Sequence, residues 1–119
     1  RTAEFYLTAA DAAARLGHTT DAINYLTPLM TKRLNAPAYQ TTTALIGTMT
    51  EEELIQEILD ERARELAFEG HRWYDLRRTS QPALTRVYDG TTYTLLPEQY
   101  TMRFPSEAVE ANPEIERWQ

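Results

Sequence analysis

Four glutamates recur at every fourth position in the middle of the chain: Glu57, Glu61, Glu65 and Glu69. Paired carboxylates are the groups that hydrolyse glycosidic bonds, one acid being protonated while the other is ionised. Between residues 60 and 78, however, five acids are interspersed with five arginines. Neighbouring arginines lower the pKa of a carboxyl group and keep it ionised, which removes the general acid that hydrolysis needs. We therefore expect no catalytic residue among these carboxylates.

The same acids are candidates for a metal site, because carboxylate-bridged di-iron bundles take glutamates from paired helices. Those sites also need a histidine three residues after a glutamate. Phe68 stands three residues after Glu65, and Arg72 stands three residues after Glu69. His71 follows Glu69 by only two residues, and the chain has no cysteine that could supply a thiolate. The sequence predicts no metal site and no cofactor.

An arginine occupies the apolar face of the helix expected over residues 51–69. On a wheel of about 100° per residue, the centre of that face falls close to Arg62. A buried, unpaired guanidinium is strongly unfavourable, so Arg62 needs a carboxylate or carbonyl partner, and Glu65 at i+3 is the nearest. We expect Arg72, Arg77 and Arg78 to neutralise the glutamate column. The predicted structural ion-pair network consists of Glu61, Arg62, Glu65, Glu69, Arg72, Asp75 and Arg78.

Two consecutive helices are expected to position this network, in the segment 50–80. Thr50 and Glu53 have the spacing of a capping box, which predicts the start of the first helix. Gly70 is placed to end that helix after Glu69. A shorter helix is expected from His71 to Arg78. Its Trp73 and Tyr74 lie next to the network and are predicted to belong to the core.

The N-terminal residues 1–34 are predicted to form an αα-hairpin. A first alanine-rich helix over residues 3–17 would end at Gly17, and Thr19 or Thr20 would cap the second. Pro28 predicts a kink or a break in that second helix. The run LGHTTDAINYL resembles the middle of a tetratricopeptide unit. Residues 35–49 contain Pro37, Gly47 and three consecutive threonines, and are predicted to be a loop.

Residues 81–119 are predicted to hold a short β-hairpin followed by a tail. Asp89-Gly90 between two β-prone runs is a strong hairpin signal. The tail contains three prolines and is expected to be an irregular strap, held at its end by Trp118. Tyr88, Tyr93, Tyr100 and Trp118 are better placed than the network to meet a ligand, although no ligand-binding residue can be assigned. The predicted fold class is mostly α, with a tetratricopeptide-like helical hairpin, a helix pair, a β-hairpin and the strap.

Length and charge limit the functional classes. A chain of 119 residues makes a single domain or a fragment of a longer protein. The net charge of −6 argues against nucleic acid and against docking on an anionic membrane surface. No apolar run reaches the roughly 20 residues of a membrane span. The chain starts at Arg1, so any targeting segment would lie upstream of it.

The central run carries a family resemblance. Residues 58–78 read I-x-x-E-R-x-x-E-L-x-F-E-G-x-R-x-x-D-L-x-R, which resembles the C-terminal signature of the SusD/RagB family. Residues 103–114 are similar to that family's closing pattern P-x-x-E-[IL]-x-x-N-P, with departures at Ala108 and Val109. The helical hairpin fits as well, because these proteins carry tetratricopeptide-like helix pairs. The resemblance covers nearly the whole chain.

The resemblance implies a function. Family members are lipid-anchored proteins of the Bacteroidetes outer membrane that face outward and bind glycans or other nutrients. They act as a lid on a TonB-dependent transporter of the SusC type, and they are not enzymes. The chain would then be the C-terminal region of a longer protein whose lipid anchor lies outside this sequence. The alternative is a soluble tetratricopeptide-type adaptor that binds a protein partner.

Overall fold

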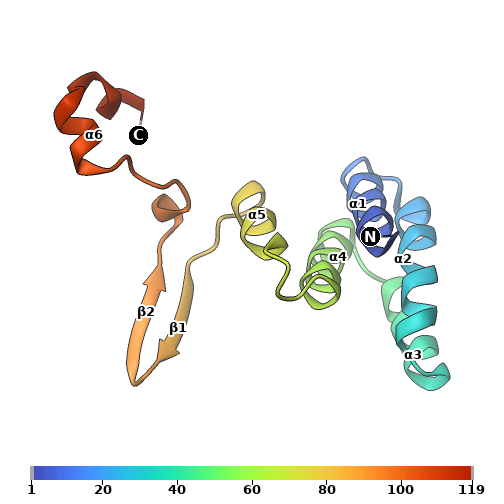
Figure 1. Cartoon of the computed structure of the whole chain (residues 1–119). Helices are drawn as coiled ribbons and strands as arrows, with labels where there is room; N and C mark the ends of the chain where they lie inside the picture. The colour runs from blue at the N-terminus through green and yellow to red at the C-terminus, as the bar shows by residue number, and fades with distance from the viewer. Residues whose placement is uncertain (1, 119) are drawn as a thin grey trace. The chain divides into compact units, whose positions relative to one another are not determined.

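The computed structural model describes the backbone of residues 2–118 and the side chains of residues 2–115. The chain forms two compact units, Arg1–Asp75 and Leu76–Gln119. In chain order the first unit contains α1 (Thr2–Arg15), α2 (Thr19–Arg33), α3 (Ala36–Ile46), α4 (Glu51–Glu65) and the start of α5 (His71–Arg78) (Figure 1). The second holds β1 (Leu84–Tyr88), β2 (Thr91–Leu95), the 3₁₀ turns η1 (Pro97–Tyr100) and η2 (Pro113–Trp118), and α6 (Ser106–Ala111). The prediction of a mostly α fold with a β-hairpin is confirmed.

The predicted helical hairpin is confirmed in α1 and α2, which pack against each other across a tight turn. Gly17 has φ +74 and ends α1 as expected. The amide of His18 donates to the carbonyl of Ala13 at 2.9 Å, and that of Gly17 donates to Ala14 at 3.0 Å. Together these two bonds form a Schellman motif, which satisfies carbonyls that the end of α1 would otherwise leave exposed.

The cap of α2 differs from the expectation, and of the kink or break expected at Pro28 the break is absent. The N-cap residue is His18, without a side-chain cap bond, so neither Thr19 nor Thr20 caps the helix. Pro28 lies inside α2, yet the helix continues to Arg33 without a break. Pro28 is exposed, so the carbonyl that loses its amide partner four residues earlier can be hydrated.

The predicted loop over residues 35–49 is wrong, because most of it is helix α3. The side chain of Asn35 accepts a hydrogen bond from the amide of Ala38 at 3.0 Å and so caps the helix. Pro37 falls in the first turn, where a missing amide does no harm. The hydroxyl of Thr43 donates to the carbonyl of Tyr39 at 2.7 Å inside the helix. Ile46 then anchors the end of α3 in the core.

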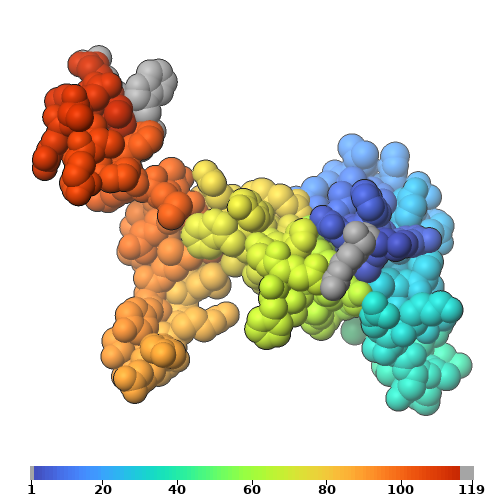
Figure 2. All heavy atoms as spheres, viewed as in Figure 1, coloured from blue at the N-terminus to red at the C-terminus, as the bar shows by residue number. Residues whose placement is uncertain are grey.

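The core of the first unit lies between α1, α2 and α4. In Figure 2 the atoms of these three helices adjoin one another. The small alanines of α1 let both neighbours approach closely, and the larger side chains come from α2 and α4. The buried residues are Leu7, Ala10, Ala13, Ala14, Ala22, Leu26, Leu29, Met30, Ile46, Leu54 and Ile58.

The predicted capping box of α4 is present. The amide of Glu53 donates to Thr50 Oγ1 at 3.3 Å, and Glu53 Oε2 accepts from the amide of Thr50 at 2.8 Å. The helix ends at Glu65, four residues earlier than predicted. Phe68 (φ 64) and Gly70 (φ 81) then adopt left-handed conformations that turn the chain into α5.

We expect Thr50→Ala to lower the free energy of unfolding by about 1 kcal/mol, because it removes one half of this capping box. Urea titration followed by circular dichroism measures the change. Thr20→Ala is the matched control: its side chain is exposed, in the first turn of the uncapped helix α2. Its substitution should shift the unfolding free energy by less than about 0.5 kcal/mol. Equal effects of the two substitutions would contradict the capping role of Thr50.

In the second unit the predicted hairpin is confirmed, with β1 and β2 antiparallel and side by side (Figure 1). Asp89 (φ 47) and Gly90 (φ 72) form the turn, and a positive φ at both central residues is typical of a type I′ hairpin. The tail is less irregular than expected, because η1, α6 and η2 alternate with extended residues. The predicted anchoring by the side chain of Trp118 lies outside the described residues.

Candidate functional site

A buried ion pair joins three helices of the first unit. Arg62 of α4 donates from Nε to Oδ2 of Asp75 at 3.0 Å, and these side chains are only 8% and 4% exposed. Arg62 Nη1 also donates to Thr8 Oγ1 of α1 at 3.1 Å. The predicted burial of Arg62 is therefore confirmed. Its partner in this pair is Asp75 of α5, which is 13 residues further along the chain, and not Glu65.

Glu65 has a different arginine as its partner. Arg33, at the end of α2, reaches Glu65 through two bonds, Nε to Oε2 at 2.8 Å and Nη2 to Oε1 at 2.6 Å. This hydrogen bond and the negative charge of Glu65 raise the pKa of the Arg33 guanidinium. The bidentate pair therefore links α2 to α4 through fully charged groups.

Two further glutamates of the column, Glu57 and Glu61, are neutralised from within α4. Arg64 bonds to Glu61 Oε2 from Nε at 2.8 Å and to Glu57 Oε1 from Nη2 at 2.6 Å. Partial burial acts to lower the pKa of Arg64, but its hydrogen bonds to Glu61 and Glu57 outweigh burial and raise it. The expectation that α5 supplies the main cations is wrong for Glu57 and Glu61, which pair with Arg64. The bidentate partner of Glu65 comes from α2.

The remaining predicted members of the network make weaker or different contacts. Arg72 lies 3.7 Å from Asp60 Oδ1 and 3.4 Å from the carbonyl oxygen of Leu59. Glu69 and Arg78 are each engaged in an interaction as well. His71 Nδ1 lies 3.9 Å from Glu4 of α1. Charge-assisted bonds of this kind fasten helices together.

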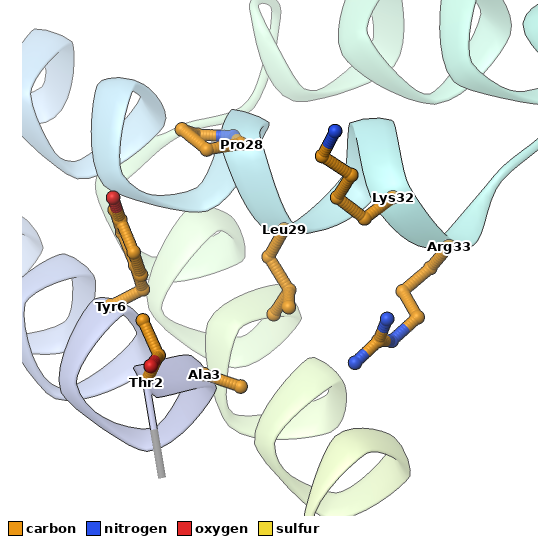
Figure 3. Close-up of a pocket in the computed structure, with 7 residues that line it drawn as sticks. All are labelled: Thr2, Ala3, Tyr6, Pro28, Leu29, Lys32 and Arg33. Carbon is orange, nitrogen blue, oxygen red and sulfur yellow. The ribbon is translucent and has the colours of Figure 1, made fainter.

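A shallow hollow of about 290 Å³ lies between α1 and α2 (Figure 3). Tyr6 and Leu29 reach into the space between the two helices, and Lys32 lies at its rim. A neighbouring hollow shares Tyr6 and includes the exposed Phe5 and Tyr25. The lining combines apolar side chains with the hydroxyl of Tyr6 and the cations Lys32 and Arg33, so the hollow could hold a ligand. Its residues are Thr2, Ala3, Tyr6, Pro28, Leu29, Lys32 and Arg33.

The hollow was not predicted from the sequence. Tyr6 and Lys32 come from two helices, and no sequence motif relates positions on one helix to positions on the other. The sequence did place large side chains such as Phe5, Tyr6 and Tyr25 on an alanine-rich hairpin. The same pattern is expected for a repeat helix that packs against a neighbouring repeat, so it does not identify a binding site.

The aromatic predictions are partly wrong. Tyr74 is 67% exposed and Trp73 is 37% exposed, so neither is a core residue. Tyr100, expected to meet a ligand, is buried, and its hydroxyl donates to the carbonyl of Pro82 at 2.8 Å. Tyr88 and Tyr93 on the hairpin are exposed, as a ligand contact requires. The side chain of Trp118 lies outside the described residues.

Two observations on the described residues concern metal binding and membrane spanning. Among the described side chains, those of residues 2–115, no group of three or more His, Cys, Asp or Glu is arranged to hold a metal ion. In the same part of the chain, no helix has the length and apolarity needed to cross a membrane.

Comparison with known proteins places the chain in a family. The sequence model of the SusD family matches residues 1–116 of the 119. No curated protein matches the chain. The match includes the helical hairpin, the α4–α5 signature and the tail, which are the three parts on which the resemblance depends. This chain belongs to the SusD family.

Proposed function

We propose that this protein binds glycans or related nutrients at the bacterial outer membrane and assists their uptake through a SusC-type TonB-dependent transporter. The observation that carries the proposal is the SusD family match over residues 1–116. The net charge of −6 supports a partner that is neither nucleic acid nor an anionic membrane surface. We further propose that a lipid anchor outside this sequence attaches the protein to the cell surface.

We propose that the protein binds its ligand without altering it. The carboxylates that could have served hydrolysis lie against guanidinium groups: Glu61 against Arg64, Glu65 against Arg33 and Asp75 against Arg62. A glycosidase needs one carboxyl group protonated near neutral pH, and arginine partners oppose that protonation. The three contacts support a structural role for the signature helix.

The binding proposal predicts that the protein is retarded in affinity gels containing soluble polysaccharide. Xylan, mannan, amylose and polygalacturonate are suitable probes, followed by a glycan array. We expect slower migration in at least one gel, with no release of reducing ends after prolonged incubation. Bovine serum albumin, which is also acidic, controls for sieving. Failure to bind any of these polysaccharides or any array glycan would contradict the proposed function.

The alternative is an adaptor that binds another protein through its helical hairpin. The exposed Phe5 on α1 and Leu16 just after its end favour it, because repeat helices use such side chains to pack against neighbours. Isolation of the native protein from outer membranes distinguishes the two. Co-purification with a TonB-dependent transporter supports uptake, whereas recovery in the soluble fraction with a different partner supports the adaptor.

A further inference from the structure

One face of the β1–β2 hairpin carries two tyrosines and an arginine. The register pairs Arg86 with Tyr93 and Tyr88 with Thr91. Side chains alternate between the two faces of a strand, and directly paired residues share a face. Arg86, Tyr88 and Tyr93 therefore lie on the same face, which we call the tyrosine face. Val87 and Thr92 form a pair on the opposite face.

The hairpin holds this face in one arrangement. The type I′ turn at Asp89-Gly90 fixes the register, because both residues adopt positive φ. On the opposite face the hydroxyls of Thr85 and Thr94 lie 3.2 Å apart and share a hydrogen bond across the strands. Arg86 Nη1 donates to the carbonyl of Thr85 at 2.8 Å, which holds the guanidinium close to the strand. The backbone positions from which the three side chains project are therefore set before a ligand binds.

The tyrosine face is open to solvent. Tyr88 is 75% exposed and Tyr93 is 58% exposed. Among the described residues, neither phenol hydroxyl makes a hydrogen bond, and Arg86 makes no ion pair. Most of the donors on this face are therefore available to a ligand. Exposed tyrosine rings that no packing explains are a feature of binding surfaces, because each ring offers both a flat apolar face and a polar tip.

The chemistry of this face suits a sugar better than a protein side chain. A pyranose ring has a C–H face that stacks on an aromatic ring, and hydroxyls at its rim that need donors and acceptors. Tyr88 and Tyr93 offer the rings, and Arg86 offers a planar set of donors between them. A protein partner can also use tyrosine and arginine, but it buries them in a well-packed, desolvated pocket. The aliphatic pair on this face, Leu84 with Leu95, is already half-buried.

We propose that the tyrosine face is a saccharide-binding platform, on which Tyr88 and Tyr93 stack against sugar rings and Arg86 donates to ring hydroxyl or carboxylate oxygens. This inference rests on the proposed function, and it locates one contact surface for the glycan. Tyr88 of β1 and Tyr93 of β2 are diagonal neighbours across the two strands. Two successive sugar units could therefore stack on the two rings.

The test uses the polysaccharide that retards the wild-type chain most strongly in the affinity gels. We expect Tyr88→Ala and Tyr93→Ala each to weaken binding by about tenfold, as loss of a central aromatic contact does, and the double variant to abolish retardation. Arg86→Ala should weaken binding of polygalacturonate more than binding of a neutral polysaccharide. Val87→Ala and Thr92→Ala, on the opposite face of the same strands, are the matched controls and should bind as wild type.

The outcomes separate the two levels of the proposal. Absence of wild-type binding contradicts the proposed function itself. Wild-type binding that survives in a folded Tyr88→Ala/Tyr93→Ala variant overturns only the platform. If the variants unfold, NMR on the wild-type chain decides: the ring protons of Tyr88 and Tyr93 should shift on addition of oligosaccharide, whereas those of Tyr25 in the first unit should not. Shifts at Tyr25 alone would overturn the platform.

Discussion

Replacing Arg62 by methionine should lower the free energy of unfolding by about 3–5 kcal/mol, the range seen when one partner of a buried ion pair is removed. Arg62 and Asp75 are both buried, and the Nε–Oδ2 distance is 3.0 Å. Methionine matches the volume of the arginine stem but offers no donor, so the carboxylate of Asp75 loses its guanidinium. The bond to Thr8 Oγ1 is lost as well, which loosens α1 from α4. Urea unfolding monitored by circular dichroism measures the change.

Two variants distinguish loss of the pair from loss of packing. In Arg62→Met/Asp75→Leu neither charge remains, and such replacement of a buried pair is often neutral or stabilising. The double variant should therefore recover a large part of the lost stability. Arg64→Met is the matched surface control, because Arg64 is more than half exposed and its pairs lie at the rim. Unchanged stability of Arg62→Met would falsify the buried pair.

The sequence correctly predicted the helical hairpin, the start of α4, the β-hairpin and the burial of Arg62. Each of those features depends on residues close together in the chain. They are the apolar residues on one face of a helical wheel, the Thr50–Glu53 capping pair, the glycine that follows a helix, and the Asp89-Gly90 turn. The wheel placed Arg62 correctly because a helix repeats regularly. It could not name Asp75, because the turn at Phe68 and Gly70 determines which residue of α5 comes near.

Errors about ion-pair partners arose because the partner side chain came from another helix. Glu65 was expected to serve Arg62, yet Arg33 at the end of α2 takes it in a bidentate pair. Trp73 and Tyr74 were placed in the core because they are large and apolar, yet on α5 Tyr74 is 67% exposed and Trp73 is 37% exposed. Helix α3 was missed because its threonines and Pro37 are poor helix formers, and capping by Asn35 together with burial of Ile46 outweighs their low propensities.

The candidate binding surface was only partly visible in the sequence. Tyr88 and Tyr93 could be chosen as exposed residues of a hairpin, but their position on one face with Arg86 depends on the register. That register follows from a two-residue turn at Asp89-Gly90, so a sequence argument could have reached it. Burial of Tyr100 could not have been reached, because its hydroxyl partner is a backbone carbonyl eighteen residues away.

Truncation of Leu54 should strongly destabilise the first unit. Leu54 is 0% exposed and lies in the cluster that α4 shares with α1 and α2. Leu54→Ala removes buried methyl groups and leaves a cavity that its neighbours can fill only partly. Such substitutions lower the free energy of unfolding by about 2–5 kcal/mol. The cavity should be apolar and dry, so the midpoint of thermal unfolding should fall while the helical circular dichroism of the folded state is retained.

Leu45→Ala is the matched control for this truncation, because it deletes the same atoms from a leucine that is 58% exposed on α3. No cavity forms at an exposed position, and the free energy of unfolding should change by less than about 0.5 kcal/mol. The difference between the two variants isolates the contribution of burying α4 against the helical hairpin. Equal losses would mean that α4 is not packed there, and the Arg62–Asp75 pair would then have no buried environment in which to act.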